Sequence, residues 1–154
     1  MTVNATSLLG LALPVTGTET GTWGDTVNNA LTSLLDTAVA GVTSLTTDAD
    51  VTLTTTTLAA NQARQAIILW APASGTTTRN ITAPAQSKTY TVINNSGGTQ
   101  SIVIRGAGPT TGVTVIKGEY CTVAWNGSDF VKTGTNQVGV STGKSIAMAM
   151  IFGG

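Results

Sequence analysis

Residues 120–133, YCTVAWNGSDFVKT, carry the strongest hairpin signal in the chain. The pair Asn126-Gly127 accepts the positive backbone angles of a tight turn, and the flanking residues are rich in β-branched and aromatic side chains. The pattern predicts two antiparallel strands, 120–125 and 129–133, joined at this pair. The residues upstream of this hairpin indicate how many further strands the domain contains.

Short segments of the same kind recur every 8–12 residues or so through the zone 42–133. Residues 66–70, AIILW, are apolar on both faces, which is typical of a central strand covered on both sides. The predicted strands are 51–57, 66–70, 79–83, 88–94, 101–105, 112–116, 120–125 and 129–133. Their number and spacing predict a mainly β domain, either an antiparallel sandwich, a jelly-roll-like domain or a barrel.

One amphipathic helix is predicted over residues 22–41. Thr22 suits its N-cap, Asp25 lies in the first turn, and Gly41 provides the stop. The apolar residues recur at helical spacing and form one stripe, which we expect to be buried in the fold or in an assembly: Trp23, Val27, Ala30, Leu31, Leu34, Leu35 and Ala38.

The remaining parts of the chain flank this helix and the β domain. Residues 1–21 are predicted to be an irregular lead-in, so that 1–41 form an N-terminal arm and helix, 42–133 the β domain, and 134–154 a linker and an apolar C-terminal arm. No apolar run approaches 18 residues and no charged segment precedes the leucines near the start. We therefore expect neither a membrane span nor a secretory signal.

The C-terminal arm, KSIAMAMIFGG over 144–154, follows a polar, patternless linker at 134–143. It is either a last strand of its own sheet, or an arm that inserts between neighbouring subunits by adding a strand or filling a groove. The polar spacer, the lack of charge and the paired methionines favour the second interpretation. In an extended conformation one face carries Ile146, Met148, Met150 and Phe152.

The composition predicts a surface that is sparsely charged. The 154 residues (15.5 kDa) suit one domain, and contain 7 basic and 7 acidic residues, 9% in all, for a net charge of zero. There are instead 31 threonines and 18 glycines. Such a surface stays soluble if hydroxyl groups hydrate it or if other subunits cover it, so the sequence favours self-assembly.

The same composition argues against several classes of protein. Without a basic excess the chain is not expected to bind nucleic acid. Histidine is absent and there is one cysteine, so we expect no metal site, no cofactor and no disulfide framework. Cys121 lies in strand phase with apolar residues and lacks an activating histidine, which favours a buried thiol over a nucleophile.

Three further groups of residues have a structural and a functional interpretation. Asp48 and Asp50 suit a turn better than a calcium loop, which needs more oxygen ligands. Together with Glu119 and Asp129 they are the candidates for a glycan-hydrolase carboxylate pair. The segment 106–108, GAG, lacks the following helix of a phosphate loop and is predicted to be a turn. Four aromatic residues are interpreted as core rather than as a stacking platform: Trp23, Trp70, Tyr90 and Trp125.

Several segments between residues 8 and 133 resemble segments that recur in structural proteins of tailed bacteriophages. They are LALPVTG at 11–17, GTWGDTVNNAL at 21–31, ARQA at 63–66, RNITAP at 79–84, KTY at 88–90, GVTV at 112–115 and VAWNGSDFV at 123–131. In that family the module is attached to tails and fibres or stands as a small virion protein, and the resemblance implies no catalytic residues. No long repeat array follows here, which favours a compact accessory protein over a fibre shaft.

The sequence therefore leads to one expected function and two alternatives. We expect a non-enzymatic virion protein, assembled in the host cytoplasm, that decorates the capsid surface as a homotrimer and cements neighbouring capsomers. Its partners would be itself and the major capsid protein or another virion protein. The alternatives are a tail or tail-fibre component that contacts a host glycan, and a glycan hydrolase. The candidate subunit-interface residues are Trp23, Val27, Leu31, Leu34, Ile146, Met148, Met150 and Phe152.

Overall fold

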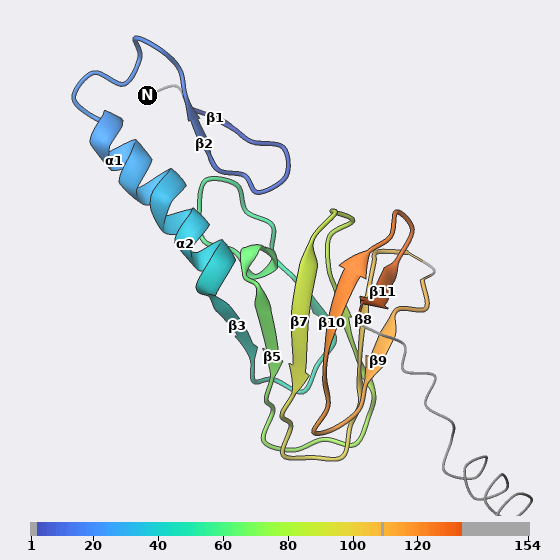
Figure 1. The fold of residues 1–154 in the computed structure, drawn as a ribbon. Helices are drawn as coiled ribbons and strands as arrows, with labels where there is room; N and C mark the ends of the chain where they lie inside the picture. Colours follow the sequence, from blue (N-terminus) through green and yellow to red (C-terminus); the bar gives the residue numbers. More distant parts are fainter. Residues whose placement is uncertain (1–2, 109, 134–154) are drawn as a thin grey trace, which may run out of the picture.

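The computed structural model describes residues 3–108 and 110–133 (Figure 1). These residues form mainly strands, arranged in mixed sheets, together with one helical segment from Trp23 to Ala40. The helix and a small N-terminal hairpin lie at one end of the β domain, as Figure 1 shows. The predicted β-rich class with one helix is thus confirmed.

Two larger sheets make up the β domain. The five-stranded sheet has the order β11-β10-β7-β5-β3 and the four-stranded sheet the order β4-β6-β8-β9. The first contains β3 (Val42–Leu45), β5 (Ile67–Trp70), β7 (Thr89–Asn94), β10 (Tyr120–Trp125) and β11 (Phe130–Thr133). The second contains β4 (Val51–Thr52), β6 (Arg79–Thr82), β8 (Ile102–Arg105) and β9 (Val113–Val115).

The chain winds between the two sheets. From β3 to β8, successive strands alternate between the five-stranded and the four-stranded sheet, so that neighbours within each sheet are parallel. The antiparallel pairs of these two sheets are β8–β9, β7–β10 and β10–β11. The predicted antiparallel arrangement is therefore wrong for half of the domain. Apolar alternation within a strand is the same in both arrangements, and here a strand of the opposite sheet serves as the crossover that parallel neighbours need.

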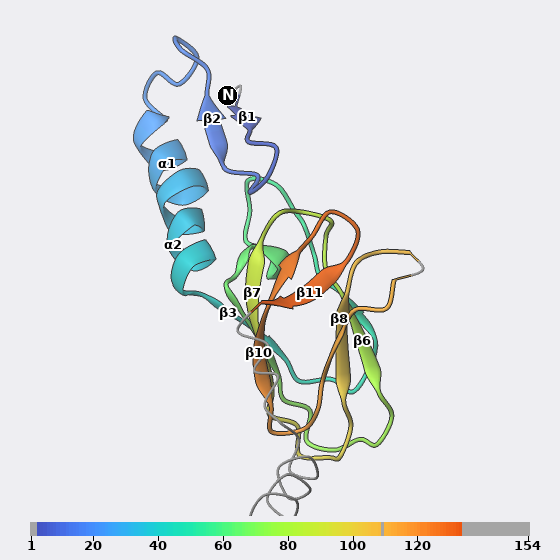
Figure 2. The same ribbon diagram turned by 45° about the vertical axis from the view of Figure 1, so that its right-hand side comes forward.

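A closed barrel, one of the three predicted architectures, is also wrong. Each sheet keeps two edge strands, β3 and β11 in one and β4 and β9 in the other. Figure 2 shows β7 and β10 on one side and β6 and β8 on the other. The predicted strand 51–57 is shorter than expected, because after Thr52 the backbone turns to bond with the loop at Gln62 and Ala63.

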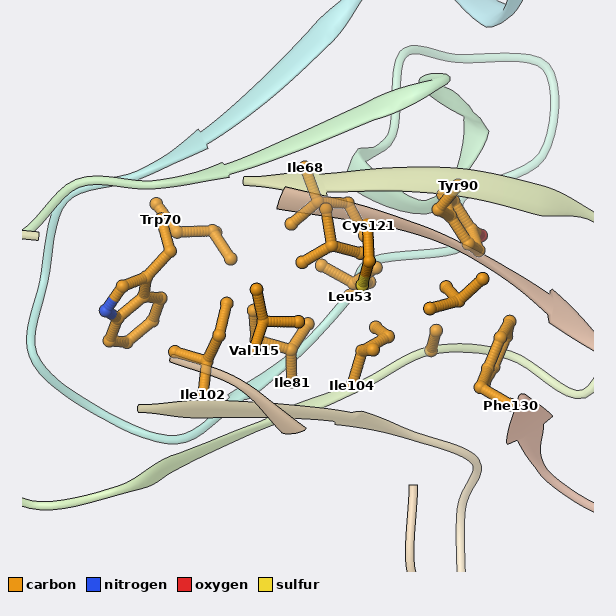
Figure 3. Packing of buried hydrophobic residues seen from close by; sticks show 14 of the residues in the cluster. Leu53, Ile68, Trp70, Ile81, Tyr90, Ile102, Ile104, Val115, Cys121 and Phe130 are labelled. Atoms are coloured by element: carbon orange, nitrogen blue, oxygen red, sulfur yellow. The ribbon is translucent and has the colours of Figure 1, made fainter. Parts of the chain in front are cut away.

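The core lies between the two sheets (Figure 3). Alternate residues of each strand point into it, as the period of two requires. The five-stranded sheet contributes Leu45, Ile68, Trp70, Tyr90, Val92, Cys121, Val123 and Phe130, and the four-stranded sheet contributes Ile81, Ile102, Ile104 and Val115. Each large apolar side chain buried there stabilises the fold by about 1.5–3 kcal/mol.

The hairpin predicted at Asn126-Gly127 is confirmed. Trp125 pairs with Phe130, and the amide of Asn126 donates to the carbonyl of Asp129 at 3.0 Å. The side-chain oxygen of Asn126 accepts from the amides of Ser128 and Asp129, each at 3.0 Å, while Gly127 takes a φ of +105°. A side chain at that angle would be strained, so glycine is the residue the turn needs.

The helical segment contains α1 (Trp23–Val27), a π-helical turn (Asn28–Thr32) and α2 (Ser33–Ala40). Its predicted extent and its stop at Gly41 are confirmed. The predicted side-chain cap is wrong: Thr22 Oγ1 donates to Glu19 Oε2 at 3.2 Å instead of accepting from the helix backbone. Thr26 Oγ1 donates to the same oxygen at 2.8 Å, so the buried Glu19 side chain holds the first turn.

The π-helical turn divides the predicted apolar stripe. A π turn contains one more residue than an α turn, which rotates all later side chains about the helix axis. As a result Leu34 is buried, whereas Trp23 is 61% exposed. The predicted stripe is therefore not one face buried within the fold: Trp23 and Leu35 are exposed, and Val27 and Leu31 are half-buried. Whether an assembly buries the exposed members stays a prediction.

The N-terminal segment is not the irregular lead-in that was predicted. β1 (Val3–Ala5) and β2 (Ala12–Pro14) form an antiparallel pair, with Val3 opposite Pro14. The loop between them is closed by Thr6, whose amide donates to Leu11 O and whose Oγ1 accepts from Leu11 N, both at 2.9 Å. Strands of three residues contain too little alternation to give a sequence pattern.

Candidate assembly surface

The exposed apolar side chains are concentrated in the N-terminal part of the chain. Nine large apolar residues are exposed among those that the structure describes, and six of them precede residue 43. Those six are Leu8, Leu13, Trp23, Leu35, Val39 and Val42, and the other three are Ile116, Tyr120 and Val131. An apolar surface gathered on one part of a molecule is typical of a surface that another protein covers.

An apolar groove lies on this part of the molecule. Its volume is about 380 Å³. The loop between β1 and β2 forms one wall and α2 another, while the segment 86–89 closes the third side. Leu8 and Val39 are 64% and 72% exposed, so the groove opens to solvent. The lining residues are Leu8, Leu9, Leu35, Ala38, Val39, Gln86, Ser87, Lys88 and Thr89.

Arg64 fixes the wall that carries Leu8 and Leu9. It ends a short 3-10 turn, η2 (Gln62–Arg64), which begins where Asn61 Oδ1 accepts from Arg64 N at 2.7 Å. Arg64 is 2% exposed, and its guanidinium donates to the carbonyls of Leu9, Ala59 and Thr56. Burial lowers the pKa of Arg64. The side chain therefore ties the N-terminal hairpin to the β domain.

Gly10 allows the loop to approach the β domain closely. It has a φ of +61°, and a Cβ atom there would lie 3.0 Å from the Cα of Thr57. The carbonyl of Gly10 accepts from the amide of Leu58 at 2.8 Å. A larger residue at this position would both strain the backbone and displace the loop.

Lys88 lies in the groove but offers it no free charge. Its Nζ donates to the carbonyls of Ala63 at 2.9 Å, Gln65 at 3.1 Å and Arg64, and lies 4.9 Å from the centre of the Tyr90 ring. Burial, together with the nearby Arg64 charge, lowers the pKa of Lys88 to about 8. Since the ammonium group is directed to backbone oxygens, the groove presents a neutral and mostly apolar surface.

The predicted interface residues have different positions in the structure. Trp23 is on the exposed surface, Val27 and Leu31 are half-buried in the helix, and Leu34 is in the interior. The structure therefore does not place these four on one accessible face. Ile146, Met148, Met150 and Phe152 lie outside the described residues.

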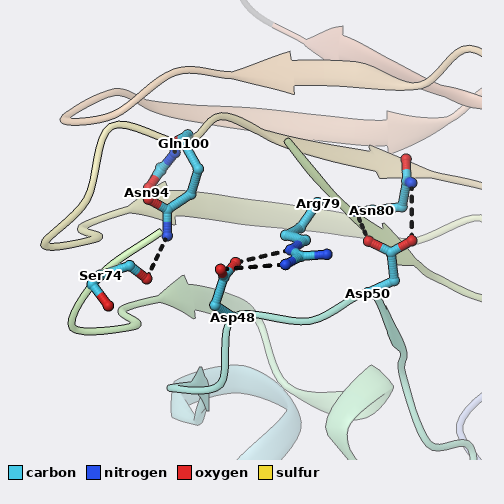
Figure 4. A network of polar contacts seen from close by, with 7 residues as sticks. All are labelled: Asp48, Asp50, Ser74, Arg79, Asn80, Asn94 and Gln100. Carbon is cyan, nitrogen blue, oxygen red and sulfur yellow. Dashed lines mark hydrogen bonds and ion pairs between the residues drawn. The ribbon is translucent and has the colours of Figure 1, made fainter. Parts of the chain in front are cut away.

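Two of the four candidate carboxylates join the loop between β3 and β4 to β6 (Figure 4). Asp48 accepts from Arg79 Nε at 2.9 Å and from its Nη2 at 3.3 Å, and this hydrogen-bonded ion pair lowers the pKa of Asp48. Asp50 accepts from the backbone amide of Asn80 at 3.0 Å and from its side chain at 3.3 Å, which lowers the pKa of Asp50. The structural interpretation of both residues is supported.

The other two carboxylates also accept local backbone hydrogen bonds. Asp129 accepts from the amides of Gly106 at 3.0 Å, Gly112 at 2.6 Å and Phe130 at 2.8 Å, which fixes the predicted turn at 106–108 beside the β10–β11 loop. Glu119 Oε2 accepts from the amide of Ile116 at 3.3 Å. Across 3–108 and 110–133, no three histidine, cysteine or acidic side chains are grouped so as to hold a metal ion.

The aromatic residues and the cysteine mostly belong to the core. Trp70 and Tyr90 are fully buried, and Trp125 packs on the core beside Phe130 with ring centroids 5.4 Å apart. The core interpretation is wrong only for Trp23. Cys121 is buried, as predicted, and burial raises the pKa of its thiol.

Sequence reasoning missed the residues that shape the groove. Helical spacing groups Leu35 with the buried stripe, and the sequence pattern assigns Leu8, Val39, Arg64 and Lys88 to no site. The spacing of Leu35 and Val39, four residues apart on a helix, was the available signal for a shared exposed face. Arg64 and Lys88 gave no such signal, because their acceptors are backbone carbonyls far away in the sequence.

Comparison with known proteins finds no relative of this chain. No family model matches the chain, and no curated protein or solved structure matches it. In the part of the chain that the structure describes, none of the helices has the length and apolar character to cross a membrane.

Proposed function

We propose that the chain is a structural protein of a tailed-phage virion that assembles with itself, as a homotrimer, on the capsid surface. There it acts as a decoration or cement protein, bridging neighbouring capsomers and resisting internal pressure. The observation that carries the proposal is the exposed apolar surface of the N-terminal part, led by Leu8, Trp23 and Val39. The resemblance of residues 8–133 to phage structural proteins supplies the biological setting.

The mechanism in this proposal is adhesive and involves no catalysis. Apolar area removed from water on assembly contributes about 25 cal/mol per Å² before ordering costs. The low charge content supports this, because few charged side chains have to be desolvated when subunits meet. The hydrogen bonds of Asp48, Asp50, Glu119 and Asp129 give these carboxylates structural roles that are sufficient to explain them.

We also propose that the β domain is a sandwich. The support is that buried residues of both sheets form one cluster. In this description the two sheets act as a rigid support that presents the N-terminal surface at one end, where the helix and the hairpin lie (Figure 1).

The location is tested by immunogold labelling of intact virions with antibodies raised against the purified chain. The proposal predicts label over the head surface, in many copies per particle. Label confined to the tail or its fibres would replace the decoration role by the tail alternative. Purified virions without label would contradict a virion protein altogether.

A further inference from the structure

We propose that the groove beside α2 receives residues 145–152 of a neighbouring copy of the chain. The inference rests on the proposed self-assembly and deepens it, because it names the two surfaces that meet. One is the groove with Leu8, Leu35 and Val39 at its rim. The other is the apolar segment SIAMAMIF that follows Lys144.

The two surfaces have matching chemistry. Among the described residues that line the groove, Lys88 alone is charged, and its ammonium group donates to three carbonyls. A charged peptide would therefore find no free partner there and would lose its hydration. Residues 145–152 carry no charge and contain five large apolar side chains, four of them at every second position. They can cover the exposed leucine and valine side chains without burying an ion.

The direction of β11 favours a neighbouring molecule over the same one. The groove is level with the start of β7, since Thr89 is among its lining residues. Across β10, Val131 of β11 lies level with Thr89 at the start of β7. Thr133, two residues later in β11, lies level with Thr91, two residues later in β7. β11 thus runs away from the groove end of the sheet. To reach the groove of its own molecule, the chain after Thr133 would have to reverse its direction, and this favours the groove of a neighbouring copy.

The ten-residue linker gives the arm a long reach. Ten residues span up to about 33–36 Å when extended. β7 pairs with β10 from Thr89 onward and with β5 from Thr91 onward, so the sheet offers the arm little free edge next to the groove. Its binding therefore depends on side chains in the groove, a mode in which apolar anchors supply the affinity.

Disulfide trapping between two full-length variants tests the exchange. Val39→Cys and Met148→Cys chains are co-expressed with tags of different mass and oxidised mildly, and Met150→Cys replaces Met148→Cys in a second pairing. Tyr120→Cys is the matched control for the groove position, because Tyr120 is 76% exposed and comes from the start of β10. The native Cys121 is buried, and wild-type chains give the background.

The proposal predicts that Val39→Cys forms at least ten times more mixed dimer with an arm cysteine than Tyr120→Cys does. Equal yields, or no mixed dimer with either arm position, would overturn it. An intramolecular disulfide in a chain carrying both cysteines, without mixed dimer, would show that the arm occupies its own groove and would also overturn it. Sedimentation of the wild-type chain distinguishes the arm exchange from the proposed self-assembly. Trimers that give no disulfide trapping would contradict only the arm exchange, whereas monomers would contradict self-assembly as well.

Discussion

The guanidinium of Arg64 donates two hydrogen bonds to the carbonyl oxygen of Leu9, from Nε at 3.0 Å and from Nη2 at 2.8 Å. The two residues are separated by 55 positions in the chain. This contact joins the N-terminal hairpin to the β domain and sets the position of one wall of the groove. The shape of the proposed assembly surface therefore depends on the buried Arg64 side chain, although Arg64 does not itself line the groove.

Arg64→Ala is expected to release the N-terminal hairpin. It removes the donor from the carbonyls of Leu9, Ala59 and Thr56. Leu9 is half-buried, and a carbonyl left unsatisfied away from water costs about 1–3 kcal/mol. Hydrogen exchange should then accelerate at the amides of Thr6 and Leu11, which close the hairpin loop. Thermal unfolding should move to a lower temperature.

Arg105→Ala is the matched control for this change. Its guanidinium also donates to backbone carbonyls, those of Gly106 and Gly108, but it serves a local loop. Exchange at Thr6 and Leu11 should be unaffected by the control. If Arg64→Ala left exchange at those amides as slow as in the wild type, Arg64 would not anchor the hairpin.

Much of the β domain was predictable because alternation and turn chemistry act locally. Asn126-Gly127 identifies its hairpin without any long-range information, and the strands 66–70 and 88–94 are recognisable from their side chains alone. The parallel winding was not predictable. It depends on which sheet each strand joins, and a strand's alternation is the same whether its neighbours run parallel or antiparallel.

The groove was less predictable than the core. Helical spacing suggested one apolar face from Trp23 to Ala38, but the π-helical turn at 28–32 rotates its second half and leaves Trp23 exposed. No residue in NNALT signals that turn. Arg64 and Lys88 were similarly hidden, since their partners are main-chain oxygens that no side-chain pattern encodes.

In Asp129→Asn, we expect the free energy of unfolding to fall less on acidification than it does in the wild type. Burial alone would raise the pKa of Asp129, but the amides of Gly106, Gly112 and Phe130 that donate to it lower the pKa below the ordinary 3.8. A lowered folded pKa stabilises the fold above pH 3.8, and the effect disappears as the pH falls through the folded value.

The measurement is the difference in unfolding free energy between pH 6 and pH 3. It should be smaller in Asp129→Asn than in the wild type. Asp36→Asn, at an exposed position on α2, is the control for replacing an acid by its amide. An unchanged difference in Asp129→Asn would mean that its carboxylate does not carry this dependence.

Because of Lys88, we expect the free energy of unfolding to increase as the pH rises from 8 to 9. Its folded pKa of about 8 lies below the ordinary 10.5, so the unfolded chain binds more protons in this range and stability rises with pH. Above this window the raised pKa values of Cys121 and Tyr90 oppose the trend. Chemical denaturation should show the rise in the wild type and a weaker one in Lys88→Met, and equal slopes would contradict a buried, perturbed lysine.

The neighbouring residues Leu34 and Leu35 should respond differently to truncation. Leu34 is buried and Leu35 is exposed. Leu34→Ala should lower the free energy of unfolding by about 2–5 kcal/mol, whereas Leu35→Ala should change it by less than about 0.5 kcal/mol in the dissociated chain. Denaturant titration at low protein concentration makes the comparison. Equal losses would show that the helix does not have the orientation described.

Sedimentation of Val39→Asp beside Tyr120→Asp tests the central claim that the N-terminal apolar surface holds the subunits together. Both residues are exposed, so either change leaves the folded chain intact, but only Val39 lines the groove. At tens of micromolar, the wild type and Tyr120→Asp should sediment as trimers. Val39→Asp should sediment as a monomer with an unchanged circular-dichroism spectrum. A monomeric wild type, or a Val39→Asp variant that remains trimeric, would contradict the account.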